Sequence, residues 1–412
     1  MIKTANPIRL VCAAAIGLFQ MVQARLPNDT LFQYQWPLKN SGGVLCQGCT
    51  VNKVGADMQL EQAWDITTGD SSIIVAILDT GCKWRRPDFA GRIWINKGEI
   101  EGNGIDDDGN GFVDDVRGWD FHDNDNDPDD LDGHGTSVAS VIGSATHNTE
   151  GFAGVDWKCK LMILRDGHGD SGLLNNSAKA IRYAIKMKAR VINISRGDTG
   201  AVLSSEYRDA IAAALQAGIV IVAGSANDGV EKLSVIAQLP GVIAVGATGP
   251  DDYRARGLKP GSSKSNFGDR LDLVAPGDYI PALDISSNEP YNQMASGTSM
   301  AAPHVVGVVA LLLAQDPGRT PAQIRDILCS TADDLVGDPL EDTPGRDKYH
   351  GCGRVNAYRA LSQVGRVRPQ QPSLNQRLNG RIEALNLFTA DGRRVLKSAP
   401  AFGIKGFSPT KP

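Results

Sequence analysis

The sequence lacks an excess of positive charge. Its 42 lysine and arginine residues are outnumbered by 47 aspartate and glutamate residues, which gives a formal net charge of -5 at pH 7. Proteins whose main partner is nucleic acid present basic surfaces to the phosphates. We therefore expect no nucleic-acid partner for this protein.

Beyond its first 24 residues, the chain also lacks an apolar run of membrane-spanning length. Within those residues, Lys3 and Arg9 precede the apolar stretch LVCAAAIGLFQMV, and VQA at 22–24 places small residues just before a cleavage point. This order predicts a secretory signal over residues 1–24 rather than a buried N-terminal helix, since the apolar stretch is too short to cross a bilayer. The mature protein is then secreted, without a membrane span. Its net charge changes from -5 to -7, because two cations leave with the signal.

The chain lacks the second CxxC or the HxxxH motif that would complete a zinc site with Cys46 and Cys49. Once the cysteine in the signal is removed, six remain, and an even number in an exported protein predicts disulfides. Cys329 and Cys352 flank a polar loop rich in proline and glycine and are placed to close it. Cys46 and Cys49 are placed to close on each other. The last two, Cys82 and Cys159, are either free or paired elsewhere.

From residue 72 onward, short β-branched runs alternate with longer helical ones. The segments SIIVAIL, KLMILR, RVINIS, IVIVA and VIAVGAT predict buried strands, and SAKAIRYAIKMKA, SSEYRDAIAAALQAG and the run from about residue 299 predict helices. Continuous apolar strands separated by helices are typical of a doubly wound, mostly parallel sheet with helices on both faces, a three-layer α/β fold. We place this domain at 61–363, after an N-terminal segment at 25–60. In such sheets, sites form at the carboxyl ends of the strands.

Three polar residues stand at the ends of predicted core elements. Asp79 ends the strand IIVAIL before a glycine turn, and His134 lies between two glycines at the start of a small-residue helix. Ser299 opens an apolar helix, whose Pro303 we place in the first turn. Singly, each residue has a simpler explanation: a turn-capping aspartate, a structural histidine and an N-cap serine. Together, in the order Asp, His, Ser, they are much harder to explain as separate coincidences.

The blocks VAILDTG, DGHGTSVAS and GTSMAAPHV resemble the three signature blocks of the subtilisin-type serine proteases, in the chain order of that family. The resemblance covers roughly residues 28–363. It implies a serine endopeptidase acting on proteins or peptides, with Ser299 as nucleophile, His134 as general base and then acid, and Asp79 as the residue that orients the imidazolium. It also implies an oxyanion hole formed by Asn227, which follows the strand IVIVA, and the Ser299 amide. The simpler interpretation of Asn227 is a turn-forming residue.

Substrate-binding residues follow from the same resemblance. The segment NISRGD resembles the cleft wall that pairs with an extended peptide, which Ser195, Arg196 and Gly197 would line. Two departures from the family pattern affect specificity: Arg196 stands where an apolar residue is usual, and Ala226 stands where glycine usually precedes the oxyanion asparagine. We expect Arg196 to favour an acidic or polar side chain before the scissile bond and Ala226 to shorten the primary pocket. A third departure, Ser137 in place of a second histidine, removes no catalytic atom.

A long acidic insertion at about 99–132 separates the first two signature blocks. Residues 106–132 hold twelve aspartates against one arginine, and DDDGNG places oxygen ligands at alternate positions before a turn glycine, as in the first half of an EF-hand loop. The closing glutamate of an EF-hand is absent, since Arg117 takes its position. We expect structural calcium, as in similar insertions of bacterial subtilisin-like proteases, rather than a solvated, disordered loop. Apolar residues that could anchor the loop to the core are Phe112, Val113, Val116 and Trp119. The predicted ligands are Asp106, Asp108, Asn110 and Asp115 at one ion, and Asp123, Asp125 and Asp127 at a second.

Residues 364–412 form a tail of different composition. They begin with a run rich in Arg, Pro, Gln and Gly that is typical of a linker, and RIEALNLFTADGRRVLKS then alternates around a central Asp-Gly like a hairpin. This stretch weakly resembles the start of a C-terminal sorting module, and a disordered tail explains it equally well. The whole sequence thus predicts a secreted, monomeric, calcium-stabilised serine endopeptidase. The alternatives are a catalytically inactive protease-like protein and a calcium-dependent binding protein.

Overall fold

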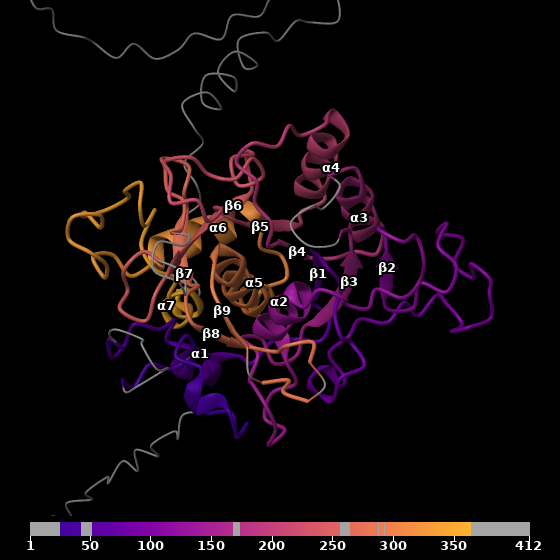
Figure 1. Cartoon of the computed structure of the whole chain (residues 1–412), viewed down its shortest axis with the longest axis horizontal. Helices are drawn as coiled ribbons and strands as arrows, with labels where there is room; N and C mark the ends of the chain where they lie inside the picture. Colours follow the sequence, from indigo (N-terminus) through magenta and orange to yellow (C-terminus); the bar gives the residue numbers. More distant parts are fainter. Residues whose placement is uncertain are drawn as a thin grey trace, which may run out of the picture. The chain divides into compact units, whose positions relative to one another are not determined.

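Seven apolar strands form one parallel sheet in the computed structural model (Figure 1). In spatial order they are β2 (Gly118–Asp120), β3 (Lys160–Arg165), β1 (Ile74–Asp79), β4 (Val191–Ile194), β5 (Val220–Gly224), β6 (Ile243–Thr248) and β7 (Leu273–Pro276). Every neighbouring pair is parallel. Because β1 has β3 on one side and β4 on the other, the strand order reverses at β1. The carboxyl end of β1 is therefore where a doubly wound sheet places its site.

Helices cover both faces of this sheet, as the sequence predicts. Along β1, Val75 and Ile77 belong to one buried cluster, whereas Ala76 and Leu78 belong to the other. The first cluster includes α1 (Leu60–Ile66), α2 (His134–Gly143), α5 (Thr298–Gln315), α6 (Pro321–Thr331) and α7 (Ala357–Ser362). The second includes α3 (Leu174–Lys186) and α4 (Ser205–Gln216), which lie side by side in Figure 1. Smaller elements are η1 (Phe32–Tyr34), η2 (Pro87–Phe89) and the antiparallel pair β8 (Ile280–Ala282) and β9 (Gln293–Ala295).

The structure describes residues 25–42, 52–167, 174–255, 264–286, 288–291 and 293–363. All of them belong to one unit, Met1–Val364, and the second unit, Gly365–Pro412, lies outside this description. The predicted signal over 1–24, the tail over 364–412 and the Cys46–Cys49 motif fall outside it as well. Within it, the predicted Cys329–Cys352 disulfide is confirmed, with the two Cα atoms 5.2 Å apart, while Cys82 and Cys159 are free and buried.

The helix α5 is buried over almost its whole length. In the part of the chain that the structure describes, it alone is long and apolar enough to cross a membrane, but 89% of it is buried inside the protein, which makes it a core helix. It begins at Thr298, so Pro303 is its sixth residue and the prediction of a first-turn proline is wrong. A proline there cannot donate a hydrogen bond to the carbonyl four residues earlier, which belongs to Ser299.

The acidic insertion is anchored by aromatic packing. The ring of Phe112 contacts Trp119, Phe121 and Tyr183 edge to face, and Tyr183 belongs to α3. Trp119 and Val116 are buried, as predicted, but Val113 is 41% exposed and takes no part. The insertion is thus an ordered extension of the β2 edge of the sheet.

Candidate active site

Asp79 and His134 meet at the strand-order reversal. Asp79 ends β1 and is 1% exposed, and its Oδ1 lies 2.7 Å from Nδ1 of His134, the first residue of α2. The same oxygen accepts a hydrogen bond from the Thr80 amide. The approach is possible because Gly135 has no side chain: a Cβ there would stand 2.1 Å from the carbonyl oxygen of Gly81. The Gly135 amide instead donates to Thr80 Oγ1, at 2.8 Å.

The electrostatics of this pair stabilise charge on both partners. Burial opposes ionisation of Asp79, but the charge and hydrogen bond of His134, with a contribution from Arg196, hold its pKa below the ordinary value. Burial likewise opposes protonation of His134, yet the Asp79 carboxylate outweighs burial and raises the histidine pKa above its usual value. The imidazolium is therefore favoured at this position, as a general base requires after it accepts a proton.

The buried carboxylate of Asp130 organises the entry to α2, a role that the sequence analysis missed. Gly133, at the N-cap, has no side chain that could satisfy the first amides of the helix. Asp130 does so instead: it accepts hydrogen bonds from the amides of Asp132, Gly133 and Thr136 and from the hydroxyls of Thr80 and Thr136. It thereby connects the turn after β1 to the helix that carries His134. The available signal was an aspartate three residues before a glycine N-cap.

Ser299 and Asn227 lie on either side of Gly297. A Cβ at Gly297 would stand 3.2 Å from both Ser299 Oγ and Asn227 Nδ2, so the two polar atoms face the same small space. The side-chain oxygen of Asn227 accepts a hydrogen bond from the Thr298 amide at 2.8 Å, so its NH2 group takes no part in that bond. Thr298 also accepts a hydrogen bond from the Ala226 amide through Oγ1. Thr298 therefore fixes Asn227 relative to Ser299, a second role that sequence reasoning missed.

The backbone of Ser299 is fixed by Ser195. The Ser299 carbonyl cannot bond to the nitrogen of Pro303, and it accepts a hydrogen bond from Ser195 Oγ at 2.8 Å. Asn193 Nδ2 in turn donates to that hydroxyl at 2.9 Å. Ser195, predicted to line the substrate cleft, thus directs its side chain to the residue predicted as nucleophile. It links the end of β4 to the start of α5.

Arg196 faces the protein interior, which overturns the expectation that its guanidinium points at a substrate. Its side chain is 16% exposed, and Nη1 lies 3.1 Å from Oδ1 of Asp166, which is 4% exposed. Asp166 immediately follows β3, and its amide donates to the Asp79 carbonyl. The buried ion pair therefore lies beside the Asp79–His134 pair, and the positive charge of Arg196 lowers the pKa of both Asp79 and His134.

Ala226 and Gly197, two of the predicted substrate-binding residues, lie close together. A Cβ at Gly197 would stand 3.3 Å from the Ala226 Cβ. Ala226 is 3% exposed and has a φ of +83°, a conformation that glycine adopts more readily. Its amide and its carbonyl are both hydrogen-bonded, to Thr298 and Asn266. Those bonds hold an alanine in backbone geometry suited to glycine. The third departure, Ser137, is buried and donates to the Leu283 carbonyl at 2.8 Å.

The first predicted calcium set is rearranged. Asp106 and Asp108 do come together, but their third partner is Glu99, with one carboxylate oxygen of each within 4.8 Å of the others. The Asn110 oxygen accepts a hydrogen bond from the Phe112 amide, and its NH2 group donates to Asp115. Buried Asp115 also accepts hydrogen bonds from Asn96 and Tyr183. Asn110 and Asp115 are thus hydrogen-bonded to one another and lie outside the Glu99 cluster, and their binding of an ion stays a prediction.

The second predicted set does not converge. Asp123 pairs with Arg165 of β3, and Asp127 pairs with Arg85, whereas Asp125 accepts a hydrogen bond from the Asp127 amide. Two of the three carboxylates are thus neutralised by arginines from outside the insertion. Among the described residues, these three carboxylates form no common cluster, and a second calcium ion at Asp123, Asp125 and Asp127 stays a prediction.

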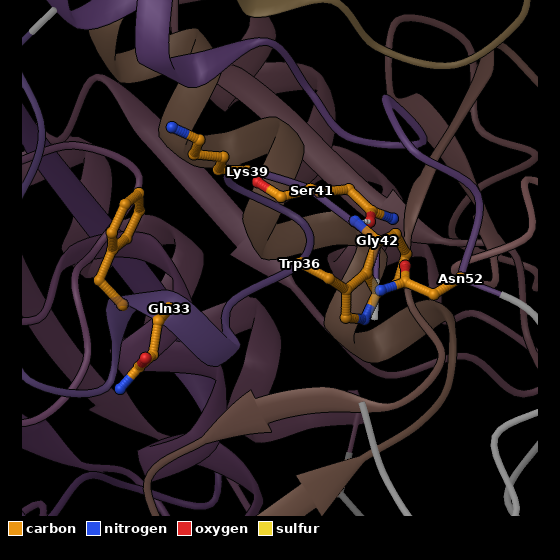
Figure 2. Close-up of a pocket in the computed structure, with 8 residues that line it drawn as sticks. Gln33, Trp36, Lys39, Ser41, Gly42 and Asn52 are labelled. Atoms are coloured by element: carbon orange, nitrogen blue, oxygen red, sulfur yellow. Dashed lines mark hydrogen bonds between the residues drawn. The ribbon is translucent and has the colours of Figure 1, made fainter. Parts of the chain in front are cut away.

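A cavity of about 310 Å³ lies in the N-terminal segment, apart from the predicted catalytic residues. It is bordered by Gln33, Trp36, Lys39, Ser41, Gly42 and Asn52, which Figure 2 shows as sticks, and also by Phe32 and Asn40. Gly42 and Asn52 flank residues 43–51, which the structure does not describe. None of the predicted catalytic residues borders this cavity, so it is not part of the site at β1.

Comparison with known proteins places this arrangement in context. Residues 70–353 match the subtilase family. Thermitase from Thermoactinomyces vulgaris is 36% identical over 306 residues, which cover 74% of this chain and 93% of thermitase. A thermophilic serine proteinase from Bacillus sp. (strain AK1) is 35% identical over 341 residues, 82% of this chain and 69% of that protein. A solved protease structure from Pseudoalteromonas arctica has a TM-score of 0.60 and 27% identity, and the match covers 82% of this chain and 98% of that one.

Proposed function

Because this chain belongs to the subtilase family and is a serine-type endopeptidase, we propose that it cleaves peptide bonds through an acyl-enzyme on Ser299, with His134 and Asp79 completing the triad. The observation that carries this proposal is the 2.7 Å contact between Asp79 and His134 at the strand-order reversal. In the proposed reaction, Asp79 holds the Nδ1 proton of His134, which leaves Nε2 as the base for the serine hydroxyl. The same nitrogen then returns the proton to the leaving amine.

The tetrahedral intermediate needs donors for its oxyanion. Asn227 Nδ2 and the Ser299 amide are the proposed pair, because both lie at the amino end of α5, where backbone N–H groups have no acceptor within the helix. The position of Asn227 Nδ2 near Gly297 and the hydrogen bond between Thr298 and the Asn227 oxygen support this assignment. A donor held in place before the reaction starts needs no reorganisation as negative charge develops.

Protein or peptide substrates follow from the family, and the cleft proposed for them runs along residues 195–197. An extended peptide would pair with the backbone of this segment as an added strand. With Arg196 held by Asp166, its guanidinium supplies no charge to the substrate, so we propose that the preference depends on shape. The methyl group of Ala226, close to Gly197, supports a shortened primary pocket.

Subtilases generally bind structural calcium, and Glu99, Asp106 and Asp108 are the residues we propose to hold it. A separation of up to 4.8 Å between their oxygens is about twice the calcium–oxygen distance of ~2.4 Å, so one ion could touch all three. The ion would neutralise carboxylates that lie close together and would tie the start of the insertion to its centre. We also propose that the protein is secreted, on the basis of the predicted signal over residues 1–24 and the Cys329–Cys352 disulfide.

A fluorophosphonate probe separates the proposed protease from a catalytically inactive or calcium-dependent binding protein. The probe reacts with a serine only when a neighbouring base and an oxyanion hole activate that serine. We expect labelling of the wild-type protein at Ser299, none in Ser299→Ala, and full labelling in Ser72→Ala, which removes an exposed serine before β1. A folded wild-type protein that stays unlabelled would leave only the binding functions.

A further inference from the structure

The loop between α6 and α7 contains a buried histidine that the proposed catalytic site does not use. The loop runs over residues 332–356, and the Cys329–Cys352 disulfide closes most of it. It is fastened to the sheet next to β7, where the Cys352 amide donates to the Asp272 carbonyl at 2.8 Å. His350 lies within it and is completely buried.

Both ring nitrogens of His350 lack a hydrogen-bond partner among the described residues. A neutral imidazole has one donor and one acceptor, and burying both without partners is unfavourable. The ring is enclosed tightly, because a Cβ at Gly337 would stand 2.4 Å from its Nε2 atom. A bound ion that accepts the lone pair of one nitrogen would remove this cost.

Two carboxylates converge on the same place. One ring nitrogen of His350 and one oxygen each of Asp342 and Asp347 lie within 4.8 Å of one another. Asp342 is 4% exposed; its Oδ2 accepts a hydrogen bond from the Gly337 amide, and its Oδ1 has no partner among the described residues. Asp347 is oriented by the amides of Thr343, Tyr349 and His350.

The lysine and arginine side chains near this cluster form ion pairs with acidic residues outside it. Lys348 pairs with Glu231, Arg346 with Asp272, and Arg254 with Glu341. Within the described part of the chain, no lysine or arginine pairs with Asp342 or Asp347. The cluster therefore combines two carboxylates, a histidine and no compensating charge.

We propose that His350, Asp342 and Asp347 bind one divalent cation of the zinc class, which fixes the loop between α6 and α7. Zinc is bound by mixed sets of imidazole nitrogen and carboxylate oxygen, whereas calcium takes oxygen ligands alone. The charge of the ion balances the two carboxylates, and the ion satisfies the His350 nitrogen. The backbone amides on Asp342 and Asp347 supply the outer hydrogen bonds that orient metal-binding carboxylates. The site is structural and is separate from the calcium site proposed at Glu99.

The test uses the full chain carrying Ser299→Ala, which cannot digest itself. After chelation and dialysis, zinc alone is titrated by calorimetry, and cobalt is added as a spectroscopic probe. We expect one zinc ion per chain, a rise in melting temperature with zinc, and a visible cobalt spectrum without the near-ultraviolet band of thiolate ligands. Adding His350→Asn should weaken zinc binding by about 100-fold or more, because losing an outer partner alone costs up to ~100-fold.

Two further variants distinguish a loss of zinc binding from a loss of folding. Asp342→Asn retains His350 and the shape of the site, so it should fold and still lose the zinc-dependent rise in melting temperature. The matched control is His122→Asn, which changes an exposed histidine in the acidic insertion, and it should bind zinc like the parent. Unchanged zinc binding in both His350→Asn and Asp342→Asn, or no zinc uptake by the parent protein, would overturn the proposal.

Discussion

Gly135→Ala tests whether the close approach of two backbones sets the reactivity of His134. Alanine is the better helix former by about 1 kcal/mol, so helix propensity alone predicts a slightly more stable α2. The structure nevertheless predicts that the substitution lowers activity. The new Cβ would stand 2.1 Å from the Gly81 carbonyl oxygen, whereas ordinary contact begins at 3.4 Å, so the two segments must separate by about 1.3 Å. That movement also weakens the hydrogen bond between Gly135 and Thr80 and withdraws His134 from Asp79.

A misplacement of about 1 Å in a catalytic group lowers the rate about 10²-fold, equivalent to roughly 2.7 kcal/mol in the barrier. We therefore expect kcat/KM for a chromogenic peptide to fall about 100-fold in Gly135→Ala. A thermal melt should confirm that the protein is still folded. The matched control is Gly318→Ala, where the new Cβ meets only the exposed carboxylate of Asp316, at 3.2 Å. Undiminished kcat/KM in folded Gly135→Ala would refute the idea that the contact of α2 with the turn after β1 positions the histidine.

Three further predictions concern charge, the oxyanion and calcium. The value of kcat/KM should fall as the pH drops through the raised pKa of His134. Arg196→Met should move this fall to higher pH, because Arg196 lowers the His134 pKa. An unchanged pH profile would contradict an electrostatic effect of Arg196 on His134. Asn227→Ala should lower kcat by about 10² to 10³ with KM little changed, and a change in KM alone would assign Asn227 to substrate binding. A hundredfold excess of calcium over its Kd should stabilise the Ser299→Ala protein against unfolding by about 2.7 kcal/mol relative to chelator, and Glu99→Gln should remove most of this gain; equal melts with and without calcium would exclude an ion there.

Local patterns sufficed for the fold and for the position of Asp79 and His134 at one edge of the sheet, and the family resemblance supplied their pairing. Runs of apolar residues define β1 and the other buried strands, and a parallel sheet brings the carboxyl ends of its strands to one edge. Asp79 and His134, each at the end of a core element, therefore had to lie at that edge. Their contact follows from topology and from the small size of the glycines beside them.

Contacts between side chains from distant segments could not be predicted from local sequence patterns. The sequence places an unusual cation at Arg196, but only the fold brings Asp166, at the end of a different strand, beside it. The count of one arginine in the acidic insertion was correct, yet Arg165 and Arg85 enter from outside and take Asp123 and Asp127. Glu99 was overlooked because it precedes the repeating aspartates. The fold of the loop brings it close to Asp106 and Asp108, and the spacing of the aspartates in the sequence does not show this.

The burial of α5 has a consequence for how the protein becomes active. This helix carries Ser299 at its first turn and contacts α2 and the strands β4, β5, β6 and β7. Those elements span residues 134–276, so all of them must be assembled before the apolar helix has a place in which to pack. In the proposed triad, Ser299 would therefore reach His134 only in the completed fold, and a partly folded chain holds its serine and its histidine on elements that have not yet met. If the triad is as proposed, a nascent or unfolding chain has no working hydrolytic centre with which to cleave its neighbours.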